Sequence, residues 1–254
     1  MPASRDELVT TLHAPRLESG DTRPVAMVHG MERALPGLRL EWSVSESGQL
    51  ISLPQRDAWL MRPEPDYEGG LPLVCNGDET YPIALSGLES PALPTHDRQP
   101  LFNVHASMPL DERTAAAAPA VLEALSENAR AHWGLAAPGP VMSVIADQIC
   151  HSPRQPPHPP HGLPVIQMDW ALRSPELPHC LGWLNYWSAA VARFIGFPDA
   201  TRDAELLSRS RRTASGAWIV CLTNAPLDLN TPTHRQVLLR AYERFPGIGG
   251  RSSP

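Results

Sequence analysis

The chain has 254 residues, 42% of them hydrophobic, and its 27 acidic and 21 basic residues give a net charge of −6. This composition is typical of a folded globular protein, and the length suits one large domain or two small ones. All of the basic residues are Arg. That excludes P-loop NTPases, Schiff-base enzymes and protein kinases, because their chemistry requires a Lys.

The N-terminal half is predicted to be rich in strands, which are recognised by alternation or by β-forming residues between turn signals. Its helices are recognised by apolar residues at helical spacing and by capping residues. In chain order, the predicted elements are a strand at Glu7–His13, a helix from Asp21 or Thr22 to Leu35, strands at Leu38–Val44 and Gln49–Leu53, a helical turn at Gln55–Met61, strands at Leu73–Asn76, Tyr81–Leu85 and Leu101–Ala106, and a helix at Asp111–Trp133. Loops are expected at 63–70 and 89–100.

The C-terminal half is predicted to be rich in helices. Its prolines should hold residues 151–162 in an extended or loop conformation. Helices are then predicted at Leu181–Ile195, Thr201–Ser210 and Pro232–Arg244, with one strand at Ala217–Leu222. We therefore expect an α+β fold with a mainly antiparallel sheet and packed helices in the N-terminal half, followed by a helix-rich C-terminal half. We expect one domain over residues 1–254, with 151–162 as its candidate sub-boundary.

The sequence contains no signal for a membrane or for export. No apolar run approaches the roughly 20 residues that a membrane helix needs. The first 15 residues lack a basic segment followed by an apolar one. The four Cys residues have no Cys-x-x-Cys spacing, as expected for reduced thiols. We therefore expect a cytoplasmic protein that does not associate with a membrane.

Charge is unevenly divided along the chain. Residues 1–127 hold 19 acidic residues and 9 Arg, a net charge of −10, and residues 128–254 hold 8 acidic residues and 12 Arg, a net charge of +4. The acidic half would not be drawn to nucleic acid, whose phosphates need cations. It would either attract a basic protein or form an ordinary solvated surface.

The strongest candidate for a metal site is the histidine group His151, His158 and His161, with His179 nearby in sequence. Imidazole is a good zinc ligand. However, these residues lie mostly on a Pro-rich segment with no carboxylate close by, which indicates a solvated linker. We therefore expect no metal and no cofactor.

Candidate catalytic residues are few. Cys75 in Val-Cys-Asn-Gly-Asp could act as a nucleophile if the fold brought a histidine to it, but a strand cysteine before a turn explains the same letters. The carboxylate pairs Asp78–Glu79 and Asp199–Asp203 could serve in acid–base chemistry. The second pair is better explained by the start of a helix, where negative charge is favoured. We expect no catalytic residue.

Two clusters in the C-terminal half allow both a structural and a binding interpretation. Trp183, Tyr186 and Trp187 would share one helical face, either in the core or as a binding anchor, and we favour the core. Three arginines form a basic group, and we expect them to pair with the acidic half: Arg209, Arg211 and Arg212.

The stretch from Ser174 to Arg251 resembles the C-terminal signature of the bacterial polymorphic-toxin family called immunity protein 52. The matching segments are Ser-Pro-Glu-Leu-Pro at 174–178, Leu-Gly-Trp-Leu-Asn-Tyr-Trp-Ser at 181–188, Gly-Phe-Pro-Asp at 196–199, Asp-Ala-Glu-Leu-Leu at 203–207, Arg-Arg-Thr at 211–213, Gly-Ala-Trp at 216–218, Pro-Leu-Asp-Leu at 226–229 and Tyr-Glu-Arg-Phe-Pro at 242–246. Segments 29–32 and 56–60 resemble related uncharacterised proteins. The resemblance implies an α+β protein that binds a cognate toxin in the cytoplasm and blocks its activity.

We therefore predict an immunity protein, not an enzyme, that occludes the active site of a nuclease toxin. The acidic half should supply the contacts, since recognition residues concentrate on loops and an aromatic anchor ringed by charges is a common arrangement. The predicted contact residues are Asp57, Trp59, Asp66, Glu68, Asp78 and Glu79. The alternative is a small hydrolase that uses Cys75 or a His-bound metal.

Overall fold

A computed structural model describes residues 7–61, 70–90, 100–149, 159–167 and 176–251. The chain forms two compact units. Residues 8–132 make up the first, called the N-terminal unit. The second, called the C-terminal unit, holds residues 1–7 and 133–254. The predicted α+β class with an antiparallel sheet in the N-terminal half is confirmed. The predicted sub-boundary at 151–162 lies largely outside the described residues.

In the N-terminal unit the strands follow the order β3-β2-β4-β5-β6-β1. The strands are β1 (Glu7–Pro15), β2 (Trp42–Val44), β3 (Leu50–Ser52), β4 (Leu71–Cys75), β5 (Ala84–Glu89) and β6 (Leu101–Pro109). Neighbours pair antiparallel from β3 through β6. Along β6 buried and more exposed residues alternate, as expected for a sheet with one covered face.

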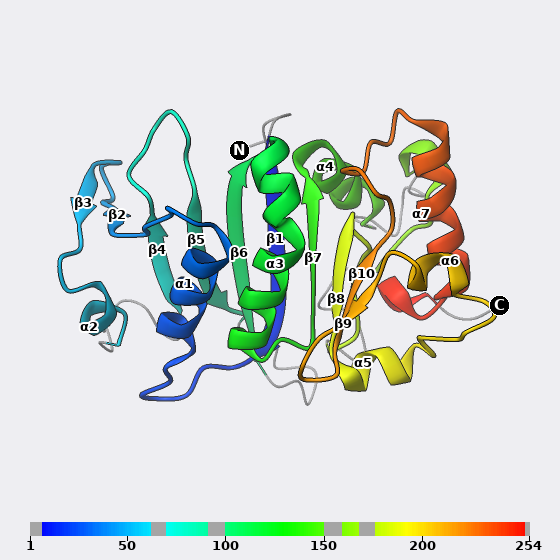
Figure 1. Cartoon of the computed structure of the whole chain (residues 1–254), viewed down its shortest axis with the longest axis horizontal. Helices are drawn as coiled ribbons and strands as arrows, with labels where there is room; N and C mark the ends of the chain where they lie inside the picture. The colour runs from blue at the N-terminus through cyan, green and yellow to red at the C-terminus, as the bar shows by residue number, and fades with distance from the viewer. Residues whose placement is uncertain (1–6, 62–69, 91–99, 150–158, 168–175, 252–254) are drawn as a thin grey trace, which may run out of the picture. The chain divides into compact units, whose positions relative to one another are not determined.

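Two helices, α1 (Arg23–Ala34) and α3 (Glu112–Ala129), cover that face side by side (Figure 1). Gly30 allows α1 to approach α3 closely, because a Cβ there would lie 2.5 Å from Asn128 Nδ2. Asp111 caps α3 by accepting a hydrogen bond from Thr114 N at 2.8 Å, and Thr114 Oγ1 in turn accepts from Asp111 N. A third, short helix, α2, spans Arg56–Leu60.

The prediction that α3 continues to Trp133 is wrong. The helix ends at Ala129, where Arg130 adopts the left-handed conformation with φ of 55°. Trp133 and Gly134 instead begin strand β7 (Trp133–Pro138), all of whose residues are buried. The residue at the helix end is Arg130 and not a glycine, Gly134 lies within β7, and the apolar residues of β7 extended the helical pattern.

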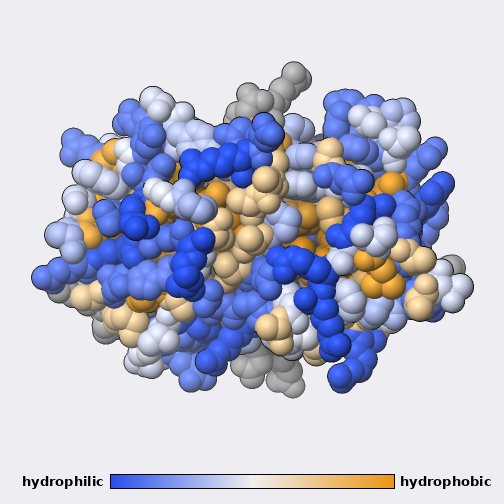
Figure 2. Space-filling model, viewed as in Figure 1, coloured by the Kyte–Doolittle hydropathy of each residue, from blue (hydrophilic) through white to orange (hydrophobic). Residues whose placement is uncertain are grey.

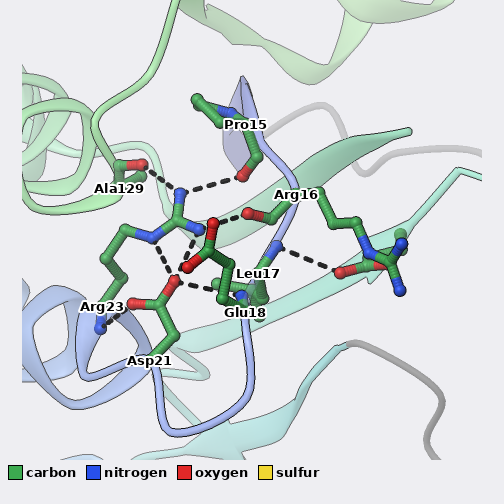
Figure 3. A network of polar contacts seen from close by, with 8 residues as sticks. Pro15, Arg16, Leu17, Glu18, Asp21, Arg23 and Ala129 are labelled. Atoms are coloured by element: carbon green, nitrogen blue, oxygen red, sulfur yellow. Dashed lines mark hydrogen bonds and ion pairs between the residues drawn. The ribbon is translucent and has the colours of Figure 1, made fainter. Parts of the chain in front are cut away.

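A buried arginine joins three parts of the N-terminal unit (Figure 3). Arg23 is 6% exposed and donates to Asp21 Oδ2, to Pro15 O at 2.8 Å and to Ala129 O at 3.0 Å. It also donates to the carbonyl of Arg16 at 2.5 Å. One guanidinium therefore satisfies the end of β1, the start of α1 and the end of α3. Burial raises the pKa of Asp21, but hydrogen bonds from Arg23 outweigh it and lower the pKa.

In the C-terminal unit the strands follow the order β7-β8-β10-β9. They are β7, β8 (Leu184–Trp187), β9 (Arg211–Arg212) and β10 (Trp218–Cys221). The pairs β7–β8, β8–β10 and β10–β9 are all antiparallel. The helices are α4 (Gly139–Gln148), α5 (Ala189–Phe194), α6 (Ala204–Leu207) and α7 (Pro232–Arg244), with short 3-10 turns at Pro160–Gly162 and Ile248–Gly250. The final helix matches its prediction. Among the described helices, none is long and apolar enough to cross a membrane.

The predicted helix at Leu181–Ile195 is wrong in its first half, which forms β8. All four residues of β8 are buried, so the strand shows no alternation, and its sequence cannot be told from that of a buried helix. The expected core position of the aromatic residues is nevertheless confirmed. Trp187 packs edge-on against Phe197 and Phe245, with centroids 5.1 Å apart in each pair, and Trp183 Nε1 donates to Thr223 O at 2.8 Å.

The Arg23 network yields a stability prediction. Replacing Arg23 by Met would leave Asp21 and three carbonyls without their donor, and should cost about 3–5 kcal/mol. Arg16→Gln is the matched control, because the Arg16 side chain is 63% exposed and its partner Glu89 keeps a hydrogen bond from Leu17 N at 3.0 Å, so its loss should cost about 1 kcal/mol or less. The measurement is urea unfolding of both variants. Equal unfolding midpoints for Arg23→Met and the unmodified protein would contradict this role.

Candidate protein-binding surface

The outermost strand pair of the N-terminal unit carries apolar side chains on its exposed side. Trp42 pairs with Ser52 and Val44 pairs with Leu50 across the β2–β3 hairpin. Because side chains alternate along a strand, Trp42, Val44 and Leu50 share one face. They are 36–38% exposed, and Ile51 is 48% exposed. Ile51 pairs with Ser43 and therefore lies on the opposite face. We call Trp42, Val44 and Leu50 the hairpin surface.

On the opposite face of the hairpin Ser43 is buried, whereas Ile51 is exposed. Ser43 lies between Trp42 and Val44, is buried, and donates to Leu73 O at 2.9 Å. The hairpin therefore buries a serine and leaves large apolar side chains exposed on both of its faces, the reverse of the usual arrangement. In Figure 2 orange atoms lie among blue ones over this hairpin, at the left of the view. Exposed apolar residues at a sheet edge are typical of a surface that another molecule covers.

Trp42 connects the hairpin to the turn that follows β4. A Cβ on Gly77 would lie 2.6 Å from Trp42 Cδ1, so the indole packs directly against the backbone of Gly77. Gly77 also has φ of +72°, which favours glycine. This places the exposed residues Asp78 and Glu79 beside Trp42. Hydrogen bonds from the Thr80 hydroxyl and backbone lower the pKa of Asp78, so its carboxylate stays ionised.

Helix α2 is held in place by a largely buried ion pair. Arg56 Nη1 lies 2.5 Å from Glu32 Oε1 and donates to Leu40 O at 3.2 Å. Burial lowers the pKa of Arg56, but the hydrogen bonds and charges of Glu32 and Asp57 outweigh it and raise the pKa. Glu32 Oε1 also accepts from Leu40 N at 2.9 Å. Helix α1 therefore holds both α2 and the segment that leads into β2.

Asp57 stands at the margin of a pocket beside the hairpin. Its carboxylate is 48% exposed and contacts His29 Nε2 at 2.9 Å and Arg56 Nε at 3.1 Å. The pocket has a volume of about 390 Å³ and is lined by Glu41, Ser52, Leu53, Pro54, Gln55, Arg56, Asp57 and Ala58. Glu41 precedes Trp42 directly. Glu41 therefore lines the pocket, and the next residue, Trp42, packs against the turn at Gly77.

Four of the six predicted contact residues are described, and they lie around the hairpin surface. Asp57 and Trp59 are on α2, where Trp59 is half-buried, and Asp78 and Glu79 are on the exposed turn. Asp66 and Glu68 lie outside the described residues. We call Glu41, Asp57, Asp78 and Glu79 the acidic rim.

The sequence did not reveal the hairpin surface. Leu38, Leu40, Trp42 and Val44 continue one alternating pattern, which predicted a single half-buried strand. Leu38 and Leu40 are indeed buried, but only Trp42–Val44 forms a strand, and it lies outside the core. A pattern of period two marks which residues share a face but does not show where that face leaves the core.

Most of the candidate catalytic residues, but only some of the candidate metal ligands, lie in the described part of the chain. Cys75 is half-buried opposite Trp42, and no histidine in the described part of the chain hydrogen-bonds to it. Burial raises the pKa of the Cys180 thiol to about 12. Asp203 is at the expected helix start, directly before α6, and its carboxylate pairs with Arg244. No group of three metal-binding side chains occurs among the described residues. His151 and His158 lie outside the described residues, so the expectation that 151–162 binds no metal stays a prediction.

The contrast between Arg56 and Asp57 is testable. Arg56→Met should cost about 3 kcal/mol or more, because it leaves the largely buried Glu32 unpaired. Asp57→Ala should cost about 1 kcal/mol or less, because its carboxylate is 48% exposed and Arg56 keeps its contact with Glu32. Thermal and urea unfolding measure both. If Asp57→Ala destabilised the protein as much as Arg56→Met, Asp57 would be a structural residue rather than part of a binding rim.

The fold has a solved counterpart. The Pseudomonas aeruginosa T6SS protein PA0821 matches with a TM-score of 0.56 and 16% sequence identity, over 94% of this chain and 74% of that one. At this identity the similarity shows a shared fold. No curated protein matches the chain at a significant level. A family model described as a domain of unknown function, DUF5953, matches residues 19–253. The chain therefore belongs to the DUF5953 family.

Proposed function

We propose that this protein is an immunity protein that binds and neutralises a cognate bacterial toxin in the cytoplasm. The observation that carries the proposal is the hairpin surface, where Trp42, Val44 and Leu50 share one exposed face at the sheet edge. Apolar surface of this kind at a strand edge is stabilised when a partner covers it. The resemblance to immunity protein 52 supports the same function.

The chemistry around the hairpin surface selects a basic partner. The acidic rim places four carboxylates around an aromatic residue, the arrangement of a hot spot within a polar border. A nuclease toxin is a fitting partner, because its nucleic-acid groove must be cationic. The rim would occupy that groove and block access to the active site, while Trp42 and its neighbours supply the apolar contact.

The similar fold of a protein from a type VI secretion system supports a role in bacterial competition. An inhibitor of this kind needs a preformed surface rather than catalytic residues. The hairpin surface is preformed, because Trp42 rests on Gly77 and α2 is held by Glu32. Such preorganisation reduces the entropic cost of association.

The apolar contact can be tested with a matched pair of substitutions. Leu50→Ser should weaken binding to the toxin encoded by the neighbouring gene by about tenfold or more, mainly through faster dissociation. Leu88→Ser is the control, because Leu88 is 64% exposed on β5, away from the hairpin surface. Both variants should fold like the unmodified protein. Surface plasmon resonance gives the rates.

Two outcomes of this test would contradict the hairpin surface as the toxin contact. Equal affinities for Leu50→Ser and Leu88→Ser would exclude the hairpin surface as the toxin contact. If Leu50→Ser instead changed the oligomeric state in light scattering and left toxin affinity intact, a second copy of this chain would be the partner of that surface.

The acidic rim makes a separate prediction about association rates. Charge reversal at Asp57 and Glu79 should slow association by about tenfold at low salt and flatten its salt dependence, because exposed charges act mainly on encounter. Glu176→Arg is the control, since Glu176 is an exposed carboxylate of the C-terminal unit. The measurement is stopped-flow association at two ionic strengths. An unchanged salt dependence would refute the rim as a steering surface.

A further inference from the structure

The C-terminal unit contains a second pocket that the proposed function does not use. It lies between α6 and α7 and has a volume of about 140 Å³. Its apolar lining consists of Leu206, Val237 and Ala241, and its charged lining consists of Arg202, Asp203, Glu205, Arg209, Arg240 and Arg244. Four guanidinium groups therefore share one small space with two carboxylates.

The two carboxylates serve to position arginines. Asp203 is buried and binds Arg244 through two contacts, at 2.7 Å to Nε and 3.0 Å to Nη2. Glu205 contacts Arg209 Nη1 at 3.1 Å, and Arg209 Nε donates to Cys221 O at 3.4 Å. The expected pairing of Arg209 with the acidic half is wrong, because its partner Glu205 lies on the adjoining helix. Arg209 and Arg244 are mostly shielded from solvent, so their orientation is fixed in advance.

Donor groups remain available in this pocket. Arg202 Nε donates to Asp199 at 2.8 Å, and its two terminal nitrogens form no hydrogen bond or ion pair with described residues. Arg240 has no ion-pair or hydrogen-bond partner in the described part of the chain. It lies one helical turn before Arg244, a like-charge spacing that mildly destabilises a helix, and Asp203 is engaged by Arg244 rather than by Arg240. The arginines therefore form an incompletely neutralised set.

We propose that this pocket binds a small aliphatic carboxylate. The guanidinium groups of Arg202, Arg209 and Arg240 can engage the carboxylate oxygens, for which the planar fork of arginine is well suited. Leu206, Val237 and Ala241 can contact the attached methylene groups. The volume admits only a few non-hydrogen atoms. The apolar lining favours such a ligand over inorganic phosphate, which has no apolar part.

The carboxylate could come from a free small acid or from an acidic side chain of a partner protein. Glutarate represents the first source. The second is represented by glutamate blocked as its N-acetyl α-amide, which carries a single carboxylate like the side chain in a protein. Isothermal titration at constant ionic strength compares these two probes with inorganic phosphate. Tighter binding of the blocked glutamate assigns the pocket to a partner side chain, and tighter binding of glutarate assigns it to a free acid.

The variants are Arg240→Gln and, as control, Arg193→Gln, an exposed arginine on α5. Arg240→Gln should weaken carboxylate binding by about tenfold, the loss expected for one charge-assisted hydrogen bond, and Arg193→Gln should leave it unchanged. The proposal is overturned if the unmodified protein binds neither carboxylate saturably, if phosphate binds equally well, or if both variants lose affinity alike. This test needs no toxin, so its result is independent of the proposed immunity function.

Discussion

The hydrogen bonds of the buried Arg23 guanidinium hold the N-terminal unit together. They fix α1 against the end of β1 and the end of α3, and α1 in turn presents Glu32. Glu32 holds Arg56 and the backbone of Leu40, which sets the position of α2 and the entry to β2. Two carboxylate–guanidinium pairs, Asp21–Arg23 and Glu32–Arg56, therefore link the core of the unit to the hairpin surface through α1.

The polar residues of this unit divide into two groups by burial. Asp21, Arg23, Glu32 and Arg56 are largely enclosed and shape the backbone. Glu41, Asp57, Asp78 and Glu79 are more exposed, and of these Asp78 alone also fixes a turn, by accepting from Thr80 N and Tyr81 N among the described residues. A partner can therefore select among rim residues without disturbing the fold. Arginine suits the enclosed positions because several N–H groups radiate from one plane, which a lysine could not reproduce.

The sequence predicted much of the fold and less of the site. The strand β1 and the helices α1 and α7 were located to within a few residues, because Pro, Thr and Gly mark their ends. The end of α3 and the strand β8 were missed, since residues buried on both faces show no period that separates strand from helix. The acidic rim was predicted in part from charge. Trp42 was not, because burial of Leu40 and exposure of Trp42 depend on contacts distant in sequence.

The packing of Trp42 on Gly77 has an evolutionary consequence. Any side chain at residue 77 would collide with the indole, and the φ of +72° disfavours one in any case. The two residues therefore cannot diversify independently. Relatives that retain a tryptophan at position 42 should retain glycine at position 77, whereas relatives with a small residue at 42 should tolerate Asn or Asp there. Covariation at this pair would record changes of partner across the DUF5953 family.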